Sequence, residues 1–134
     1  GVEFDLDVAA PIGGGPHVPA RQQIKVDALS LDWSGFVWMN PPYGPRNGLA
    51  PWLDKFFHHG NGIALVPDRT SAPWWQPAAA KADAILFVSR KIKFERPDGT
   101  LGKSPGTGSA LMAAGAAGER ALRQSGLGVV VRPL

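Results

Sequence analysis

Short apolar runs with no polar alternation are the feature that most constrains the fold of this chain. Such runs stand at residues 36–39, 63–66 and 84–89. Strands buried on both faces have this pattern, whereas a strand with one solvated face alternates apolar and polar residues. Apolar residues at helical spacing occur between the runs, at 50–59 and 73–81. Strands that alternate with helices predict a compact α/β fold with a mainly parallel sheet and helices on both of its faces.

The remaining elements follow from weaker patterns. Val2 to Val8 alternates as a strand does, and residues 16–35 read as irregular apart from a helical turn within 27–33. Nothing splits the chain, so we expect one domain over residues 1–134. Because the chain opens directly on a strand, we expect that domain to lack an N-terminal segment. Toward the C-terminus the patterns predict a hairpin arm at 91–94, a turn at Asp98-Gly99, a loop at 99–108, a strand at 109–114, a helix at 118–125 and a strand at 128–132.

Composition removes several classes of function. The chain has no cysteine, which excludes disulfides, zinc–cysteine sites and a thiol nucleophile. His58 and His59 are neighbours on a predicted helix and cannot both face one ion, so we expect no metal site. No apolar segment approaches the roughly 18 residues of a membrane span, and no signal peptide is visible, so we expect a soluble cytoplasmic protein. A net charge of +3 permits a nucleic-acid partner without indicating one.

The run Asn40-Pro41-Pro42-Tyr43 directly follows the apolar strand at 36–39. The prolines fix φ near −65° and remove two backbone donors. The first also favours an extended conformation at Asn40. The Asn40 amide oxygen, the Pro41 carbonyl and the Tyr43 ring could then hold a flat molecule that carries an amino group. The alternative is an ordinary proline-rich turn, which a bare Pro-Pro pair would favour.

Two other predicted strands also end in polar sequence. Asp7 follows the first strand, and Pro67-Asp68-Arg69-Thr70 follows the strand at 63–66. Parallel strands bring their carboxyl ends to one edge of a sheet, where α/β proteins bind ligands. We therefore expect these tips and Asn40 to share one edge.

The tetrapeptide at 40–43 is similar to the amino-methyltransferase motif, in which Asp, Asn or Ser precedes Pro-Pro and an aromatic residue. Further segments resemble the phage-type DNA N6-adenine methyltransferase family (Dam-like), in the order that this family shows, over residues 4 to about 115. The segments are Phe4-Asp5-Leu6-Asp7-Val8-Ala9-Ala10, Asp27-Ala28-Leu29 with Trp33-Ser34-Gly35, Leu65-Val66-Pro67-Asp68-Arg69-Thr70 with Trp74-Trp75, and Ser89-Arg90-Lys91-Ile92-Lys93-Phe94.

The resemblance implies a Rossmann-like fold that uses S-adenosylmethionine as methyl donor and acts on a flipped adenine in duplex DNA, in a bacterial host cell. Catalysis would fall to Asn40, Pro41, Pro42 and Tyr43. The expected cofactor-binding residues are Asp7, Ala9 and Asp27, and the expected DNA-binding residues are Arg69, Trp74, Arg90, Lys91 and Lys93. Family members usually carry an upstream Trp-x-Thr-Pro segment, and this chain begins after the place where it would end. Gly13-Gly14-Gly15 and residues 96–108 also depart from the family pattern.

Several of these residues could instead have an ordinary structural role. Asp7 could cap a turn, Asp27 could be an exposed residue before a helical turn, and Arg69 could be an ion-pair partner. Of Trp74 and its neighbour Trp75, one is expected in the core and the other over the substrate cleft. The basic stretch that begins at Arg90 could be a solvated cationic face.

Two other functions stay open. The same motif resembles enzymes that methylate RNA or protein glutamine, but only 33 residues separate Asp7 from Asn40, too few for two complete strand–helix units at roughly 30 residues each. The chain could also be an inactive nucleic-acid-binding remnant. No separate target-recognition domain is visible, so DNA specificity would come from short loops such as 95–108. The oligomeric state and the DNA sequence recognised are not predicted.

Overall fold

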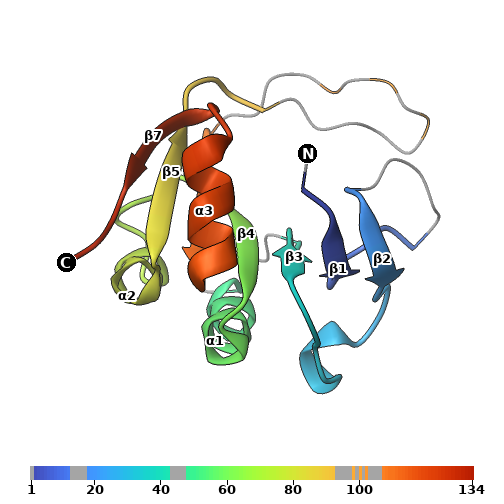
Figure 1. Cartoon of the computed structure of the whole chain (residues 1–134). Helices are drawn as coiled ribbons and strands as arrows, with labels where there is room; N and C mark the ends of the chain where they lie inside the picture. The colour runs from blue at the N-terminus through green and yellow to red at the C-terminus, as the bar shows by residue number, and fades with distance from the viewer. Residues whose placement is uncertain are drawn as a thin grey trace.

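In the computed structural model, which describes residues 2–12, 18–42, 48–92, 98, 100, 102 and 107–134, the chain forms an α/β fold around one sheet (Figure 1). The strands are β1 (Phe4–Asp7), β2 (Ala20–Gln23), β3 (Val37–Met39), β4 (Gly62–Pro67), β5 (Ala84–Val88), β6 (Ser109–Ala114) and β7 (Gly128–Val131). The helices are the 3-10 turn η1 (Ala28–Ser30), α1 (Ala50–His59), α2 (Trp75–Lys81) and α3 (Ala116–Gln124). Among the described residues, no helix has the length and apolarity needed to cross a bilayer.

The sheet is mixed, with strand order β2-β1-β3-β4-β6-β5-β7. The pairs β1–β3 and β3–β4 are parallel, as the sequence predicts, and β1–β2 is parallel as well. The prediction of a mainly parallel sheet is wrong for the other half, where β4–β6, β5–β6 and β5–β7 are antiparallel. The described residues between β5 and β6 contain no helix, and strands connected without a crossover helix pair in the antiparallel sense.

Strand β2 lies in a region that the sequence patterns mark as irregular. Its residues are Ala-Arg-Gln-Gln, and all but the first are exposed. An edge strand with polar, exposed side chains shows neither an apolar run nor an alternation of apolar and polar residues. Periodicity therefore could not reveal it.

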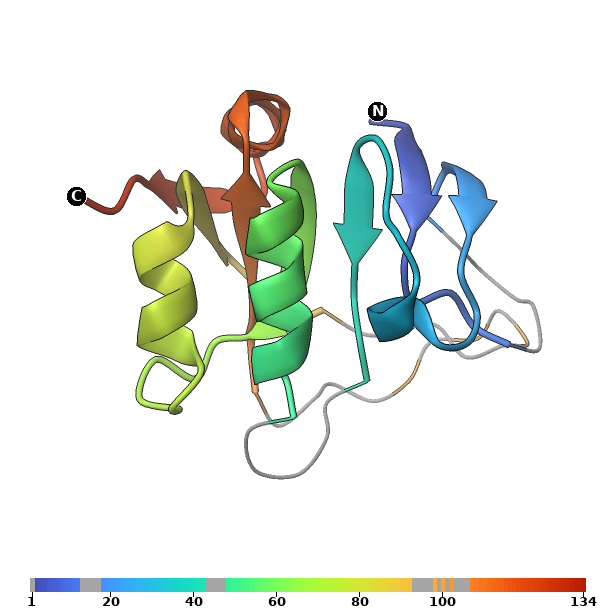
Figure 2. The same cartoon turned by 90° about the horizontal axis from the view of Figure 1, so that it is seen from below.

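Two apolar clusters lie on opposite faces of the sheet. On β4, Ala64 and Val66 belong to one cluster, and Ile63 and Leu65 belong to the other. Successive strand residues face opposite sides, so the clusters are separated by the sheet. The first cluster includes Leu53 and Phe56 from α1 and Trp75 and Ala78 from α2, and the second includes Leu122 from α3. Figure 2 accordingly shows α3 on the other side of the strands from α1 and α2.

Helix α1 has the bounds that its sequence predicts, Ala50–His59. Pro51 stands in its first turn, where a missing N–H costs nothing. Gly60 ends the helix with φ of 80°, a left-handed conformation that glycine adopts without a Cβ penalty, and its N–H donates to the Phe56 carbonyl.

Candidate active site

The chain changes direction in the sheet at β1. From β1 it continues to β2 on one side and then returns to β3 on the other, so that β1 and β3 are parallel neighbours. A strand order that reverses in this way opens a crevice at the carboxyl ends of the strands, where α/β proteins bind ligands. Asp7 and Asn40 stand at these two strand ends. The amide of Val8 donates to the Trp38 carbonyl at 3.1 Å and holds the two ends together.

Asp7 is buried, with 4% of its surface exposed. Its Oδ1 accepts a hydrogen bond from the Ala9 amide at 3.1 Å. The turn-capping role that the sequence left open is therefore present, and it fixes the direction of the carboxylate. Asp7 also lines a cavity together with Asn40, so capping does not remove it from the candidate site.

A first cavity of about 520 Å³, the η1 cavity, lies at the ends of three adjacent parallel strands. Residues 8–12 after β1, residues 25–30 after β2, Pro42 after β3, and Trp52 of α1 line it. Ala9 and Asp27, both expected cofactor-binding residues, are therefore in one cavity. Its walls are mainly apolar, with Lys25, Asp27 and Ser30 as the polar side chains.

Asp27 has an unusual backbone, with φ of 58° in the left-handed region. Asp tolerates this conformation better than most residues, and such outliers cluster at functional sites. Its carbonyl accepts hydrogen bonds from the Ser30 amide at 3.0 Å and the Ser30 hydroxyl at 2.9 Å. Its carboxylate makes no hydrogen bond that caps η1. The backbone thus fixes the turn, and the exposed carboxylate stays available on the cavity wall.

A second cavity of about 580 Å³, the sheet-face cavity, adjoins the first. Asp7 and Asn40 form a polar part of its lining, and the apolar residues along the sheet and α3 are Phe4, Trp38, Ile63, Leu65, Leu111 and Leu122. Ala9 and Pro11 line both cavities, so the segment after β1 borders each of them. A molecule in the η1 cavity and a group held at Asn40 would therefore both contact the same short segment.

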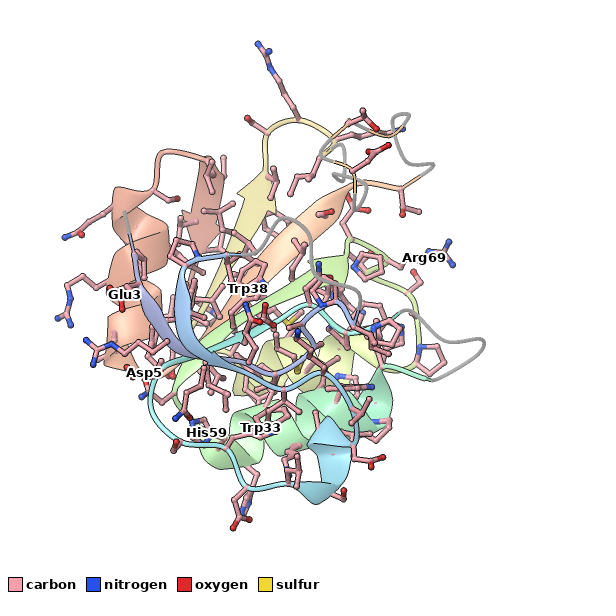
Figure 3. The ribbon with its side chains drawn as sticks, turned by 90° about the vertical axis from the view of Figure 1, so that its right-hand side faces the viewer. Glu3, Asp5, Trp33, Trp38, His59 and Arg69 are labelled. Carbon is pink, nitrogen blue, oxygen red and sulfur yellow. The ribbon has the colours of Figure 1, made fainter. Side chains whose placement is uncertain are left out.

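The expectation that three strand tips share one edge is confirmed, because β1, β3 and β4 are parallel. At this edge Asn40 is half-buried, Pro41 is buried and Pro42 is exposed. Arg69 follows β4, is exposed, and points away from the ribbon in Figure 3.

Strand β5 runs in the same direction as β4, since both are antiparallel to β6, which brings Arg90 and Lys91 toward the same edge. Both of these side chains are exposed. Tyr43, Lys93 and the glycine run 13–15 lie outside the described residues.

Trp74 does not lie on the surface. It has 6% of its area exposed and packs against Trp75 with ring centroids 5.6 Å apart. It belongs to the apolar cluster on the side of the sheet that α1 and α2 cover, the α1–α2 cluster. Both tryptophans are therefore core residues, and burial gives Trp74 a packing role.

Trp52 is among the cavity residues that were not singled out from the sequence. Trp52 reads as part of the apolar face of α1, and the structure places it half-buried on the wall of the η1 cavity. Its position in the first turn of the helix that follows the Asn-Pro-Pro-Tyr segment was the available signal. In the described ranges, His, Asp and Glu side chains form no group of three or more that could hold a metal ion.

Fold and cavities together define an α/β protein whose candidate ligand site lies at the carboxyl ends of parallel strands. The family model described as DNA N-6-adenine-methyltransferase (Dam) matches residues 1–114, which is most of the 134 residues. The chain belongs to this family, as the sequence motifs indicate, and this membership implies methylation of adenine in DNA at N6. The matched region ends with β6. No curated protein and no solved structure matches the chain.

Proposed function

We propose that this chain transfers a methyl group from S-adenosylmethionine to the exocyclic amine of an adenine in DNA. One observation carries the proposal beyond family membership: Asn40 directly follows β3, beside the end of β1, at the point where the strand order reverses. The acceptor for an amine and the position for a cofactor are thus neighbours. The parallel order β2-β1-β3-β4 is compatible with the Rossmann-like fold that we propose.

The lining of the η1 cavity supports the cofactor part of this proposal. Asp27 presents a carboxylate, which can accept hydrogen bonds from a pair of ribose hydroxyls. Leu29 and Trp52 provide apolar surface for a purine ring. Ala9 lines both cavities, and Asp7 lines the sheet-face cavity together with Asn40, where the methionine part would extend. When bound there, S-adenosylmethionine supplies an electrophilic methyl group.

Asn40 would make the adenine nitrogen a better nucleophile. The lone pair of an exocyclic amine is delocalised into the ring, and acceptors that bind its two protons draw the nitrogen toward a pyramidal geometry. The Asn40 amide oxygen and the Pro41 carbonyl supply two such acceptors. Their hydrogen bonds strengthen as positive charge develops on nitrogen, which lowers the barrier selectively. Asn40 is neutral, so the proton leaves after methyl transfer.

The adenine must leave the duplex to reach Asn40. Stacking on Tyr43 would offset part of that cost, at roughly 1–3 kcal/mol per base. Arg69, Arg90 and Lys91 are exposed toward the same sheet edge and could bind phosphates beside the site, and Lys93 would extend this group.

The test compares Asn40→Ala with Asn61→Ala. Asn61 is a matched control, since it is also half-buried but precedes β4, at the opposite end of the strands. We expect Asn40→Ala to lower kcat on unmodified duplex DNA by at least about 10²-fold, as does removal of one preorganised polar group in other enzymes. The affinity of Asn40→Ala for S-adenosylmethionine, measured by titration calorimetry, should change by less than about threefold. In Asn61→Ala, kcat and this affinity should both change by less than about threefold.

Several outcomes would count against the proposal. Undetectable binding of S-adenosylmethionine by the wild-type chain would favour an inactive remnant. Methylation of RNA or of protein glutamine in preference to DNA would redirect the substrate assignment. Unchanged turnover in a folded Asn40→Ala variant would remove Asn40 from catalysis.

A further inference from the structure

Helix α1 holds the wall of the η1 cavity from outside. The Lys55 ammonium donates hydrogen bonds to the backbone carbonyl of Leu29, at 3.1 Å, and to that of Leu31. These carbonyls belong to η1 and to the residue that ends it. Leu29 itself lines the cavity. One side chain on a helix thus binds two points of the turn that forms the cavity wall.

Among the residues that the structure describes, the turn has few other anchors. Leu29 and Leu31 are 40% and 45% exposed, so their side chains contribute little burial, and Ala28 is the buried residue of η1. Within the turn, the Ser30 amide donates to the Asp27 carbonyl and the Leu31 amide donates to the Ala28 carbonyl. These local bonds give the turn its shape, but they do not attach it to the rest of the protein.

Trp33 completes the attachment. Its ring is 8% exposed in the α1–α2 cluster, and its Nε1 donates to the Ala28 carbonyl at 3.0 Å. The Lys55 ammonium lies 5.2 Å from the ring centroid, a cation–π distance. His59, one helical turn after Lys55, lies edge-on to Trp33 at 6.2 Å and bonds the Gly35 carbonyl at 2.8 Å. Figure 3 shows Trp33 and His59 side by side.

We propose that Lys55 is a positioning residue for the cofactor: its tether to η1 keeps the turn, and with it Asp27, in the conformation that binds S-adenosylmethionine. This inference rests on the proposed function. Asp27 begins the tethered turn in a left-handed conformation that few residues adopt. A turn that opens without its tether is competent for only part of the time, and the apparent dissociation constant rises by the inverse of that fraction.

The first test needs no ligand. Lys55→Met keeps the apolar stem and removes the ammonium, whereas Lys55→Arg keeps a cationic donor. Lys81→Met is the matched control, because it removes an equal charge from an exposed ion pair with Asp54 at 3.6 Å. We expect hydrogen exchange in a peptide spanning residues 28–34 to accelerate in Lys55→Met and to stay near wild type in the other two variants.

The second test measures the cofactor. If loss of the tether leaves η1 competent for about a tenth of the time, calorimetry should show affinity for S-adenosylmethionine about tenfold weaker in Lys55→Met. The KM for the cofactor should rise similarly while kcat at saturation stays within about twofold. A merely structural role would instead lower the melting temperature and kcat together. Should Lys55→Met fail to fold, Lys55→Gln serves in its place.

The outcomes separate the two proposals. Unchanged exchange in Lys55→Met, or faster exchange with unchanged cofactor affinity, overturns the role of Lys55 and leaves the proposed function standing. A wild-type chain that binds no S-adenosylmethionine overturns the proposed function, and the role of Lys55 with it. Faster exchange together with weaker cofactor binding, restored by Lys55→Arg, establishes Lys55 as the positioning residue.

Discussion

Replacing Gly118 by alanine sets two effects of opposite sign against each other. Gly118 is buried within α3, where this helix crosses the beginning of β4. A Cβ built at Gly118 would lie 2.5 Å from the Gly62 carbonyl oxygen and 3.1 Å from the Ala113 Cβ. Alanine, however, is the better helix former, by roughly 0.8–1.0 kcal/mol.

The contact should decide the sign. Ordinary van der Waals contact begins near 3.4 Å, so the helix or the strand must move by about 0.9 Å at the carbonyl. The neighbour is backbone of a fully buried strand and cannot rotate away as a side chain could. Overpacking of this kind costs about 1–3 kcal/mol, and a backbone contact belongs near the upper end. After the gain in helix propensity, we expect a net loss of about 1–2 kcal/mol.

Urea unfolding of wild type and Gly118→Ala measures this difference, with the midpoint shifting at an unchanged slope. Arg120 is exposed in the same helix, so the pair Arg120→Gly and Arg120→Ala gives the propensity term alone, about 1 kcal/mol in favour of alanine. A Gly118→Ala protein as stable as wild type, or more stable, would refute the argument from close packing of α3 on β4.

Three further predictions concern the cofactor site, acid stability and DNA binding. Asp27→Asn keeps a residue that tolerates the left-handed conformation but loses the charge, so calorimetry should show binding of S-adenosylmethionine about tenfold weaker; equal affinity would remove the carboxylate from the site. The side-chain hydrogen bond from Arg132 lowers the pKa of Glu119, so the pair stabilises the fold above the ordinary glutamate pKa and the benefit is lost as the pH falls through the lowered value. Unfolding curves of Glu119→Gln should therefore differ from wild type near about pH 6 and converge as the pH falls through the lowered pKa of Glu119, and a gap that persists in stronger acid would contradict this linkage. Arg90→Gln should reduce by about one the slope of log affinity for DNA against log salt, measured by fluorescence anisotropy, whereas an unchanged slope would mean that Arg90 meets no phosphate.

The sequence predicts local structure well where one segment carries its own signals. Helix α1 begins and ends as predicted, because Pro51 and Gly60 mark its ends and Phe56 belongs to an apolar face. Strand β4 is buried along its whole length and reads as a continuous apolar run. Strand direction has no such signal, since an apolar run is the same in either sense. The antiparallel insertion of β6 between β4 and β5 therefore had to come from the structure.

The candidate site likewise has a part that the sequence predicts and a part that only the structure shows. Asn40 and Asp7 were identified because short motifs at strand ends carry chemistry that a sequence displays. The tether from Lys55 could not be predicted, because the residues that it joins are 24 and 26 positions apart. Its acceptors are backbone carbonyls, which every residue has, so no residue type in the sequence marks them. A lysine on the polar side of a helix reads as a solvated charge until the turn beneath it is seen.

The strands of the sheet pair over different lengths, and the longest pairing is not between the strands that carry the candidate site. Strands β4 and β6 pair along six residues, whereas the register of β1 and β3 has two pairs, Leu6 opposite Val37 and Asp7 opposite Trp38, with further backbone bonds from Asp5 and Val8. Elements with fewer backbone bonds open at a lower free energy than the best-paired core. The half that carries Asp7, Asp27 and Asn40 should thus be able to come apart while β4, β6 and β5 stay folded. A cofactor that binds only the closed form would then raise the free energy of that opening, in proportion to the logarithm of its concentration once it is well above the dissociation constant.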